Sequence, residues 1–310
     1  MSGIAYARPA RANRTWPILE MRTRLSTAEQ IAVAFFAYVA AAALGFHLAA
    51  REFCTVAALS AVTLATLVAL RRNRARAPWL AAAADLFPAL LILVAYRESG
   101  LLLAPDSAHR LDDLFVRWDR AVFQVQSVQA VLRGAAPWLQ HYLEFAYLLC
   151  YPLVPLGVVA VHFTSQRGPR GEGGERAMES FWSTVLLATL FSYAVYPFFP
   201  LTPPRVLFGD VPGPHVAPLL RKWNFWLLDH YSVQACIFPS GHAAAVTAVA
   251  LAVRRQAPRL GVLFLFLAAS VALATVYGRY HYTADAVAGA VVGVAAYQVS
   301  RLLKPLAKSN

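Results

Sequence analysis

The sequence PSGH at residues 239–242 is followed about forty residues later by GRYHYTAD at residues 278–285. A proline at a first helical position, with serine and glycine beside it, predicts a helix start whose free backbone N–H groups bind anions. His242 lies at that start. His281 and Asp285 are four residues apart, so on a helix the carboxylate lies on the same face as the imidazole and orients it.

A pair of histidines at an anion site, one of them backed by a carboxylate, indicates phosphoryl transfer through a phosphohistidine. One imidazole attacks phosphorus and the other protonates the leaving oxygen. The alternative is purely structural: a capped helix start and a buried histidine paired with an aspartate. The presence of both stretches in one chain, each at a predicted membrane-span boundary, favours the catalytic interpretation.

The composition of the chain is that of a membrane protein. Of its 310 residues, 59% are hydrophobic and only 14% are charged, which is too apolar for an ordinary soluble domain. The net charge is +12, but the arginines cluster between apolar runs, so they indicate membrane topology and we expect no nucleic-acid partner. No group of His, Cys or carboxylates has the spacing of a metal site, and we expect neither a metal nor another cofactor.

The apolar runs predict an all-α, polytopic membrane bundle of about eight transmembrane helices, each near the length that crosses roughly 30 Å of hydrocarbon. Seven of them lie at about residues 30–50, 53–70, 79–95, 138–163, 181–199, 239–254 and 260–277, and the eighth starts near His281. Eighteen of the 28 basic residues then fall in inner segments. This bias predicts cytoplasmic termini and an extracytoplasmic site.

Two segments between the apolar runs predict interfacial helices on the outer side. Near residues 111–122, apolar residues that include Phe115 alternate at helical spacing with charged residues that include Asp112 and Asp119. The second lies within residues 206–238 and carries several leucines and tryptophans.

Three further residues are candidates for contacts with the substrate. Arg205 ends the segment PLTPPR near the outer surface, where a guanidinium binds phosphate with two hydrogen bonds. Glu144 and Tyr147 share one stripe of the predicted fourth span. Ionisable groups inside a span are costly, so this stripe should face the bundle, either as a contact to the substrate headgroup or as a polar tie between helices.

The two histidine stretches resemble the second and third motifs of the type 2 phosphatidic acid phosphatase superfamily. That resemblance implies that His281 is the nucleophile, Asp285 its partner and His242 the general acid. It also implies that Ser240 and the Gly241 amide bind phosphate oxygens.

The chain departs from the common lipid phosphatases of this superfamily. Their first motif has a lysine where this chain has Phe198, and their third has Ser-Arg where this chain has Ala274 and Thr275. We expect Arg205 and Arg279 to supply the missing positive charge. The PxxPPR segment and the pair of His281 with Tyr282 are instead similar to the inositol phosphorylceramide synthase branch.

The resemblance and the hydropathy pattern together divide the chain into three parts. These are a basic cytoplasmic tail at 1–28, transmembrane helices with an outer amphipathic helix at 29–135, and a catalytic phosphatase-like bundle at 136–310.

The leading hypothesis is an integral-membrane enzyme of a bacterial-type plasma membrane that transfers a phosphoryl group or a phosphorylated headgroup, such as phosphoinositol, from a lipid donor. The first alternative is a lipid phosphate phosphatase that hydrolyses phosphatidic acid or polyprenyl pyrophosphate. A vanadium haloperoxidase and a non-catalytic lipid transporter are further alternatives. The sequence does not indicate the oligomeric state.

Overall fold

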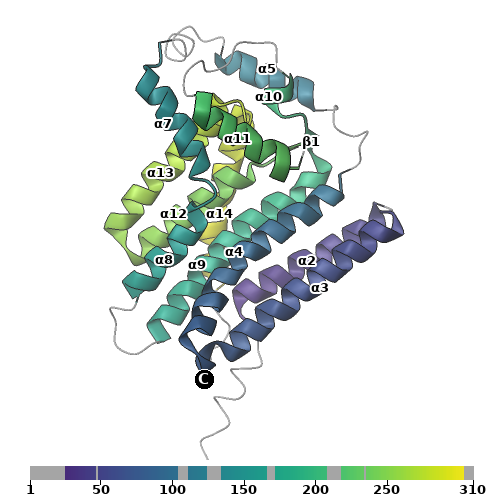
Figure 1. The fold of residues 1–310 in the computed structure, drawn as a ribbon, viewed down its shortest axis with the longest axis vertical. Coiled ribbons are helices and arrows are strands. Elements are labelled where there is room, and N and C mark those ends of the chain that lie inside the picture. Colours follow the sequence, from purple (N-terminus) through teal and green to yellow (C-terminus); the bar gives the residue numbers. More distant parts are fainter. Residues whose placement is uncertain are drawn as a thin grey trace, which may run out of the picture.

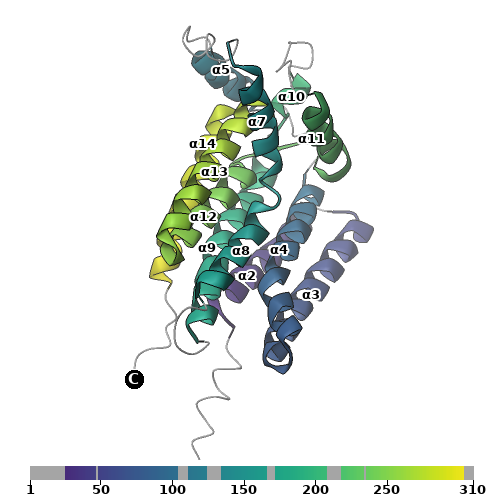
Figure 2. The ribbon, with the colours of Figure 1, turned by 60° about the vertical axis from the view of Figure 1, so that its left-hand side comes forward.

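A computed structural model describes residues 25–46, 48–103, 111–123, 134–165, 172–207, 218–233 and 235–303. The described chain is an all-α bundle whose long helices run side by side, while short helices lie at one end (Figures 1 and 2). The helices of the bundle are α2 (Thr27–Gly45), α3 (Ala50–Asn73), α4 (Pro78–Leu101), α7 (Pro137–Leu148), α8 (Leu153–Ser165), α9 (Glu172–Val195), α12 (Gly241–Gln256), α13 (Pro258–Tyr277) and α14 (Thr283–Leu302).

The remaining elements gather mainly where the site motifs lie. They are the helices α5 (Asp112–Phe123), α10 (Pro204–Leu207) and α11 (Pro218–Tyr231), the 3-10 turns η1 (Arg74–Arg76) and η2 (Tyr196–Phe198), and the two-residue strands β1 (Pro200–Leu201) and β2 (Cys236–Ile237). The strands pair antiparallel. Helices α5 and α11 fall in the two segments that were predicted to be interfacial.

Within the described residues, five helices are long and apolar enough to cross a membrane, or six if the bent pair α7 and α8 is one span. All of the predicted apolar runs contain helix, but the prediction of about eight spans exceeds this number. The difference lies in α12, which has only 16 residues, and in α14, which carries Asp285 in its first turn. Most of α12 is buried against α8, α9, α13 and α14, so it needs no long lipid-facing surface.

The predicted fourth span is broken rather than continuous. Helix α7 ends at Leu148, α8 begins at Leu153, and the two are bent by 73°. Pro152 explains the break, because it lacks a backbone N–H and its ring collides with the preceding helical turn.

Two glycines of α14 allow it to approach α12 closely. A Cβ at Gly289 would lie 2.4 Å from the Ser240 carbonyl oxygen, and one at Gly293 would lie 2.8 Å from the Ala244 carbonyl oxygen. These contacts hold the start of α14 next to the start of α12, which carries His242.

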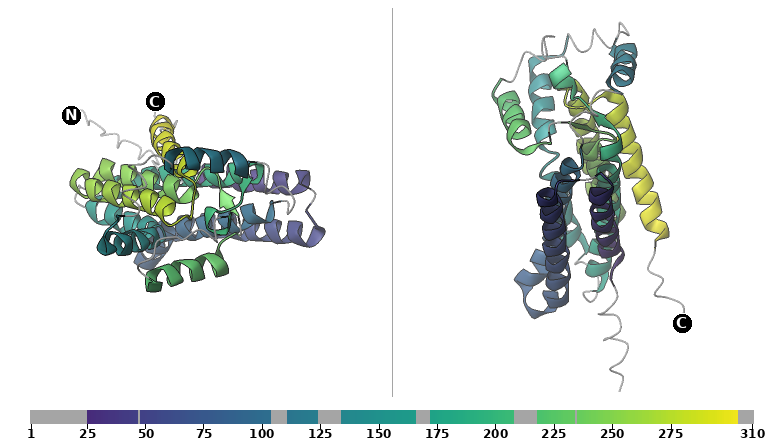
Figure 3. Two further views of the ribbon diagram at one scale, coloured as in Figure 1. Left: turned by 90° about the horizontal axis from the view of Figure 1, so that it is seen from above. Right: turned by 90° about the vertical axis from the view of Figure 1, so that its right-hand side faces the viewer.

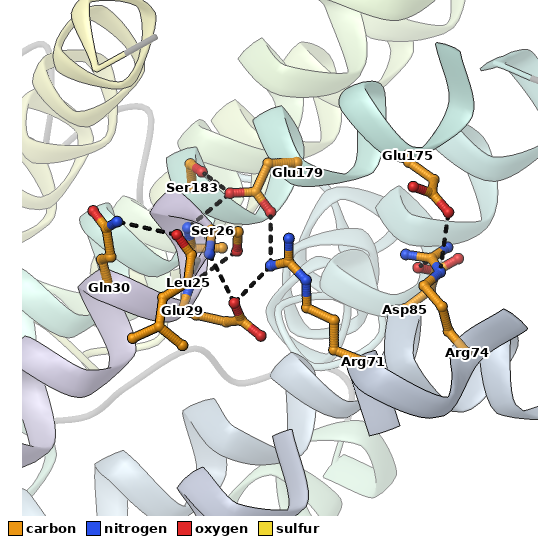
Figure 4. Close-up of polar contacts among 11 residues, drawn as sticks. Leu25, Ser26, Glu29, Gln30, Arg71, Arg74, Asp85, Glu175, Glu179 and Ser183 are labelled. Carbon is orange, nitrogen blue, oxygen red and sulfur yellow. Dashed lines mark hydrogen bonds and ion pairs between the residues drawn. The ribbon is translucent and has the colours of Figure 1, made fainter. Parts of the chain in front are cut away.

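Ion pairs tie the N-terminal helices to α9 near the junction of α3 and α4 (Figure 4). Arg71 of α3 lies 2.7 Å from Glu29 of α2 and 3.9 Å from Glu179 of α9. Arg74 lies 3.3 Å from Asp85 of α4. These contacts fix α2, α3 and α4 relative to the rest of the bundle.

Candidate active site

The histidine and aspartate of the second motif form a buried pair. Nδ1 of His281 contacts Oδ2 of Asp285. His281 is 7% exposed and Asp285 is fully buried. His281 precedes the first residue of α14, whereas Asp285 lies in its first turn, so the four-residue spacing works across the helix start. The carboxylate therefore holds Nδ1 of His281 and leaves Nε2 as the ring nitrogen available to a substrate.

The first motif forms the start of α12, but its proline is not the first helical residue as predicted. Helix α12 begins at Gly241, with Ser240 as its N-cap. The Ser240 Oγ accepts a hydrogen bond from the Ala243 N–H at 3.3 Å. Because this side chain caps the helix, the helical turn starts after Ser240, and Pro239 lies before the cap.

His242 faces His281 and two tyrosines. The centroids of the two imidazole rings are 5.6 Å apart, and the ring planes are nearly perpendicular at 83°. The rings of Tyr147 and Tyr151 each lie 5.9 Å from His242. The structure therefore brings the two histidines, found about forty residues apart in the sequence, into one site.

The histidines line one end of a cavity of about 710 Å³. Arg205, Gly241 and Tyr147 line the same cavity. Arg205 reaches it from α10, which follows strand β1. Arg205 and the two histidines therefore line one cavity.

The PAP2 superfamily matches residues 114–299, which is more than half of the chain. The chain belongs to the PAP2 superfamily. No curated protein and no solved structure matches it. Membership confirms the superfamily that the motifs predicted, and it makes the protein an enzyme of lipid phosphatase or phosphotransferase type. The long apolar helices fit an integral membrane protein that acts on a lipid.

Arg279 of this PAP2 enzyme lies in a strained loop between α13 and α14. Its φ is 61°, in the left-handed region that residues other than glycine rarely adopt. Burial and the nearby Arg221 lower the pKa of Arg279. The described lining of the cavity includes its neighbours Tyr280 and His281 but not Arg279 itself.

Glu144 lies in a buried network behind the cavity. Its carboxylate accepts hydrogen bonds from Arg221 at 2.6 Å, from the Tyr280 hydroxyl at 2.6 Å and from the Asn224 side chain at 2.8 Å. Burial and the Glu144 charge raise the pKa of Tyr280, so its hydroxyl keeps its proton and donates. Tyr280 in turn stacks on Tyr147 at 3.9 Å between ring centroids. This network fixes the loop that precedes His281.

Helix α5 contributes two buried carboxylates that its amphipathic pattern predicted to lie on the exposed charged face. Oδ1 of Asp119 accepts a hydrogen bond from the Thr283 N–H, the first residue of α14, at 2.9 Å. Oδ1 of Asp112 accepts one from the Thr202 N–H at 2.9 Å. Helix α5 packs against α14, as its position near the yellow helix in Figure 3 also shows.

The buried face of α5 follows a helical spacing that is visible in the sequence. Asp112, Phe115 and Asp119 are spaced at three and four residues, so they share one face, and all three are buried. Burial raises the pKa of Asp119, and the hydrogen bond from Thr283 opposes that effect.

Among the described residues, no group of three or more His, Cys, Asp or Glu is placed to hold a metal ion.

Proposed function

We propose that this PAP2 enzyme transfers a phosphoryl group, or a phosphorylated headgroup such as phosphoinositol, from a lipid donor through a phosphohistidine intermediate. One observation carries the proposal. The His281–Asp285 pair faces His242 with 5.6 Å between ring centroids, at the polar end of an otherwise apolar cavity. One phosphate group is small enough to contact both imidazoles at once.

The roles follow from the contacts of each ring. His281 uses Nδ1 to contact Asp285, so Nε2 is the atom that attacks phosphorus. As the N–P bond forms, the P–O bond to the lipid alcohol breaks, and His242, which the negative charge of the bound phosphate keeps protonated, gives its proton to the departing oxygen. Asp285 stabilises the positive charge that develops on the His281 ring.

The second half of the reaction reverses these steps with a new acceptor. His242, now neutral, takes a proton from the acceptor hydroxyl, whose oxygen attacks phosphorus and releases His281. An alcohol acceptor makes the enzyme a transferase, and water makes it a phosphatase. The PxxPPR segment and the His281-Tyr282 pair support the inositolphosphotransferase branch. Hydrolysis of phosphatidic acid or polyprenyl pyrophosphate is the second candidate.

The negative charge of the phosphate is held by donors from three elements. The Gly241 amide at the start of α12 offers an N–H in the favourable direction of the helix dipole. Ser240 accepts a hydrogen bond through its Oγ and retains its own proton to donate. Arg205 lines the cavity and supplies a guanidinium, and Arg279 adds positive charge from the neighbouring loop.

We place this site on the extracytoplasmic face of a bacterial-type plasma membrane, with both termini in the cytoplasm. The junction of α3 and α4, where the basic residues cluster, lies at the end of the bundle opposite α10 and α11 (Figure 1), as the bias of basic residues toward the cytoplasm requires.

A donor and acceptor panel tests the proposal. The purified enzyme is incubated in detergent with lipid phosphates and phosphodiesters, with and without inositol, diacylglycerol or ceramide. A transferase forms a new phosphodiester only when an acceptor alcohol is present, whereas a phosphatase releases phosphate without one. His281→Ala should abolish both products for every donor, and full activity of that variant would exclude the phosphohistidine route.

A further inference from the structure

The cavity at the histidines is far longer than a phosphate group. Along α4 its lining runs from Ala83 to Tyr96, and it also includes Leu70 of α3. Ala83 and Tyr96 are thirteen positions apart, which corresponds to about 20 Å of helix. The cavity thus extends from the site toward the opposite end of the bundle, between α4, α8, α9 and α12, and Figure 2 shows α4 beside α8.

The chemistry of the lining changes along this length. The end at the site has His242, His281, Arg205 and several tyrosine rings. The remainder is lined mostly by aliphatic and aromatic side chains from four helices, among them Leu86, Phe87, Leu90, Leu93, Val154 and Ala245. An anion site that continues into a long apolar cavity matches a molecule with a phosphate at one end and a hydrocarbon chain behind it.

Helix α4 forms a wall that faces both the cavity and the outside of the bundle. Leu86, Leu90 and Leu93 line the cavity, yet they are 42%, 57% and 57% exposed. The cavity therefore borders the lipid-facing surface of α4. A bilayer lipid can place its phosphate at the histidines while one tail runs along α4.

The wall is fixed at both ends. Near the site, the Tyr96 hydroxyl accepts a hydrogen bond from the Val233 N–H at 2.7 Å. Near the other end, the Trp182 indole donates to the Asp85 carbonyl oxygen at 2.8 Å, and Asp85 also pairs with Arg74. A wall held in this way gives the cavity a defined length.

Helix α4 lies outside residues 114–299, the part of the chain that matches the PAP2 superfamily. The phosphate end of the cavity thus comes from the shared superfamily region, and one long wall comes from the N-terminal helices of this chain.

We propose that the cavity binds one hydrocarbon tail of the lipid donor and that α4 sets the longest tail the enzyme accepts. The proposal rests on the proposed function in that the donor phosphate occupies the site at His242 and His281. Since bilayer hydrocarbon is as apolar as leucine, burial of the tail in the cavity gains little from the hydrophobic effect. Fit within the cavity therefore selects the tail.

Two tryptophan substitutions shorten the cavity by different amounts. Ala83→Trp fills its far end, and Ala89→Trp fills it about 9 Å closer to the site, six residues along α4. Ala82→Trp is the matched control, because Ala82 is exposed on the same helix and does not line the cavity.

The readout is the ratio of kcat/KM for a long-tailed donor to that for a short-tailed donor. Phosphatidic acid and phosphatidylinositol with dihexanoyl, dilauroyl and distearoyl chains provide the series. Overpacking of a filled site lowers affinity by about one to two factors of ten, and only a long tail reaches the new side chain. Ala89→Trp should therefore lower the ratio of kcat/KM for the distearoyl donor to that for the dihexanoyl donor about tenfold or more. Ala83→Trp should lower it less, and Ala82→Trp should leave it unchanged. Equal ratios in all four proteins would overturn the proposal while leaving the proposed function intact.

A second readout does not depend on turnover. Phosphatidic acid with a photoactivatable diazirine at the end of one stearoyl chain is crosslinked to the His281→Ala enzyme, and the labelled peptides are mapped. The label should fall on the cavity face of α4 or on α8 and should move or disappear in Ala89→Trp, but not in Ala82→Trp. Label confined to lipid-facing residues of α13, unaffected by Ala89→Trp, would show that the tail lies elsewhere.

Discussion

The N-terminal helices of the bundle are much less buried than α9 and α12. Among the N-terminal helices α2, α3 and α4, between 22% and 39% of each candidate span is buried, whereas α9 reaches 72%. Most of α12 is also buried. His242 therefore projects from a helix that touches little lipid, whereas α4, a more exposed N-terminal helix, supplies one wall of the tail cavity. Chemistry and tail selection thus depend on different parts of the chain.

Two buried aspartates, one in each half, test this division most strongly. Asp285→Asn keeps the shape of the side chain but removes the charge that orients His281, and the loss in kcat should approach about four orders of magnitude by analogy with a serine-protease triad. Asp85→Asn removes a comparable buried charge, paired with Arg74, and should change kcat less than about twofold. Phosphate release or transfer from the best donor measures both. Similar losses in the two variants would contradict the division.

Two glycines give the next largest difference. Gly289→Ala adds a Cβ 2.4 Å from the Ser240 carbonyl oxygen, so α14 must move away from α12 and the two histidines separate. Overpacking of this kind costs about 1–3 kcal/mol. Gly45→Ala adds the same methyl group to α2 where no atom lies within 4 Å. We expect lower melting temperature and lower kcat only for Gly289→Ala, measured by thermal unfolding in detergent and by turnover. A normal enzyme with Gly289→Ala would argue against tight packing at the site.

Helix α5 should have a smaller effect because it acts through one hydrogen bond to the start of α14. Asp119→Ala removes the acceptor for the Thr283 N–H, and loss of such a cap costs about 0.5–2 kcal/mol. We expect a lower melting temperature and a moderate loss of kcat, with Asp119→Asn recovering part of both because its side chain keeps an oxygen acceptor. Asp113→Ala, at an exposed position on the same helix, is the control. If Asp113→Ala lowered the melting temperature and kcat as much as Asp119→Ala, loss of the hydrogen bond to the start of α14 would not be the cause.

The smallest effect is expected from the ion pairs in Figure 4. The Arg71 side chain is 41% exposed, so solvent screens its pair with Glu29. Arg71→Gln should lower the free energy of unfolding by about 1 kcal/mol or less, without a change in kcat. A large loss of activity in this variant would show that the N-terminal half controls the chemistry directly.

Local patterns in the sequence predicted much of this arrangement. Apolar runs predicted the helices because each run is long, and the spacing of His281 and Asp285 predicted their contact because four residues make about one helical turn. The break after α7 was missed because the average hydropathy of the run hides the effect of Pro152 on the helix. The prediction that Pro239 is the first helical residue of α12 was also wrong, because the Ser240 side chain caps the helix and the first helical residue is Gly241.

Long-range partners explain what the sequence could not predict. Asp119 was assigned to an exposed face, but it contacts a backbone N–H that lies 164 residues away in the sequence. Glu144 was a candidate for headgroup contact or a tie between helices, and its partners Arg221 and Tyr280 lie 77 and 136 residues away. No local periodicity identifies such partners, because they become neighbours only when the bundle forms.

The most direct measurement of the central claim is the site of the covalent intermediate. A donor labelled in its phosphate and carrying a nitrophenyl leaving group is mixed with His242→Ala. This leaving group needs little help from an acid, so the intermediate forms, but the variant lacks the base that assists breakdown of the intermediate. The mixture is quenched in alkali, and the labelled peptide is identified by mass spectrometry. The proposed mechanism predicts label on His281 in the single variant and no label in the double variant His242→Ala, His281→Ala. Release of nitrophenol without label on any histidine would contradict the phosphohistidine mechanism.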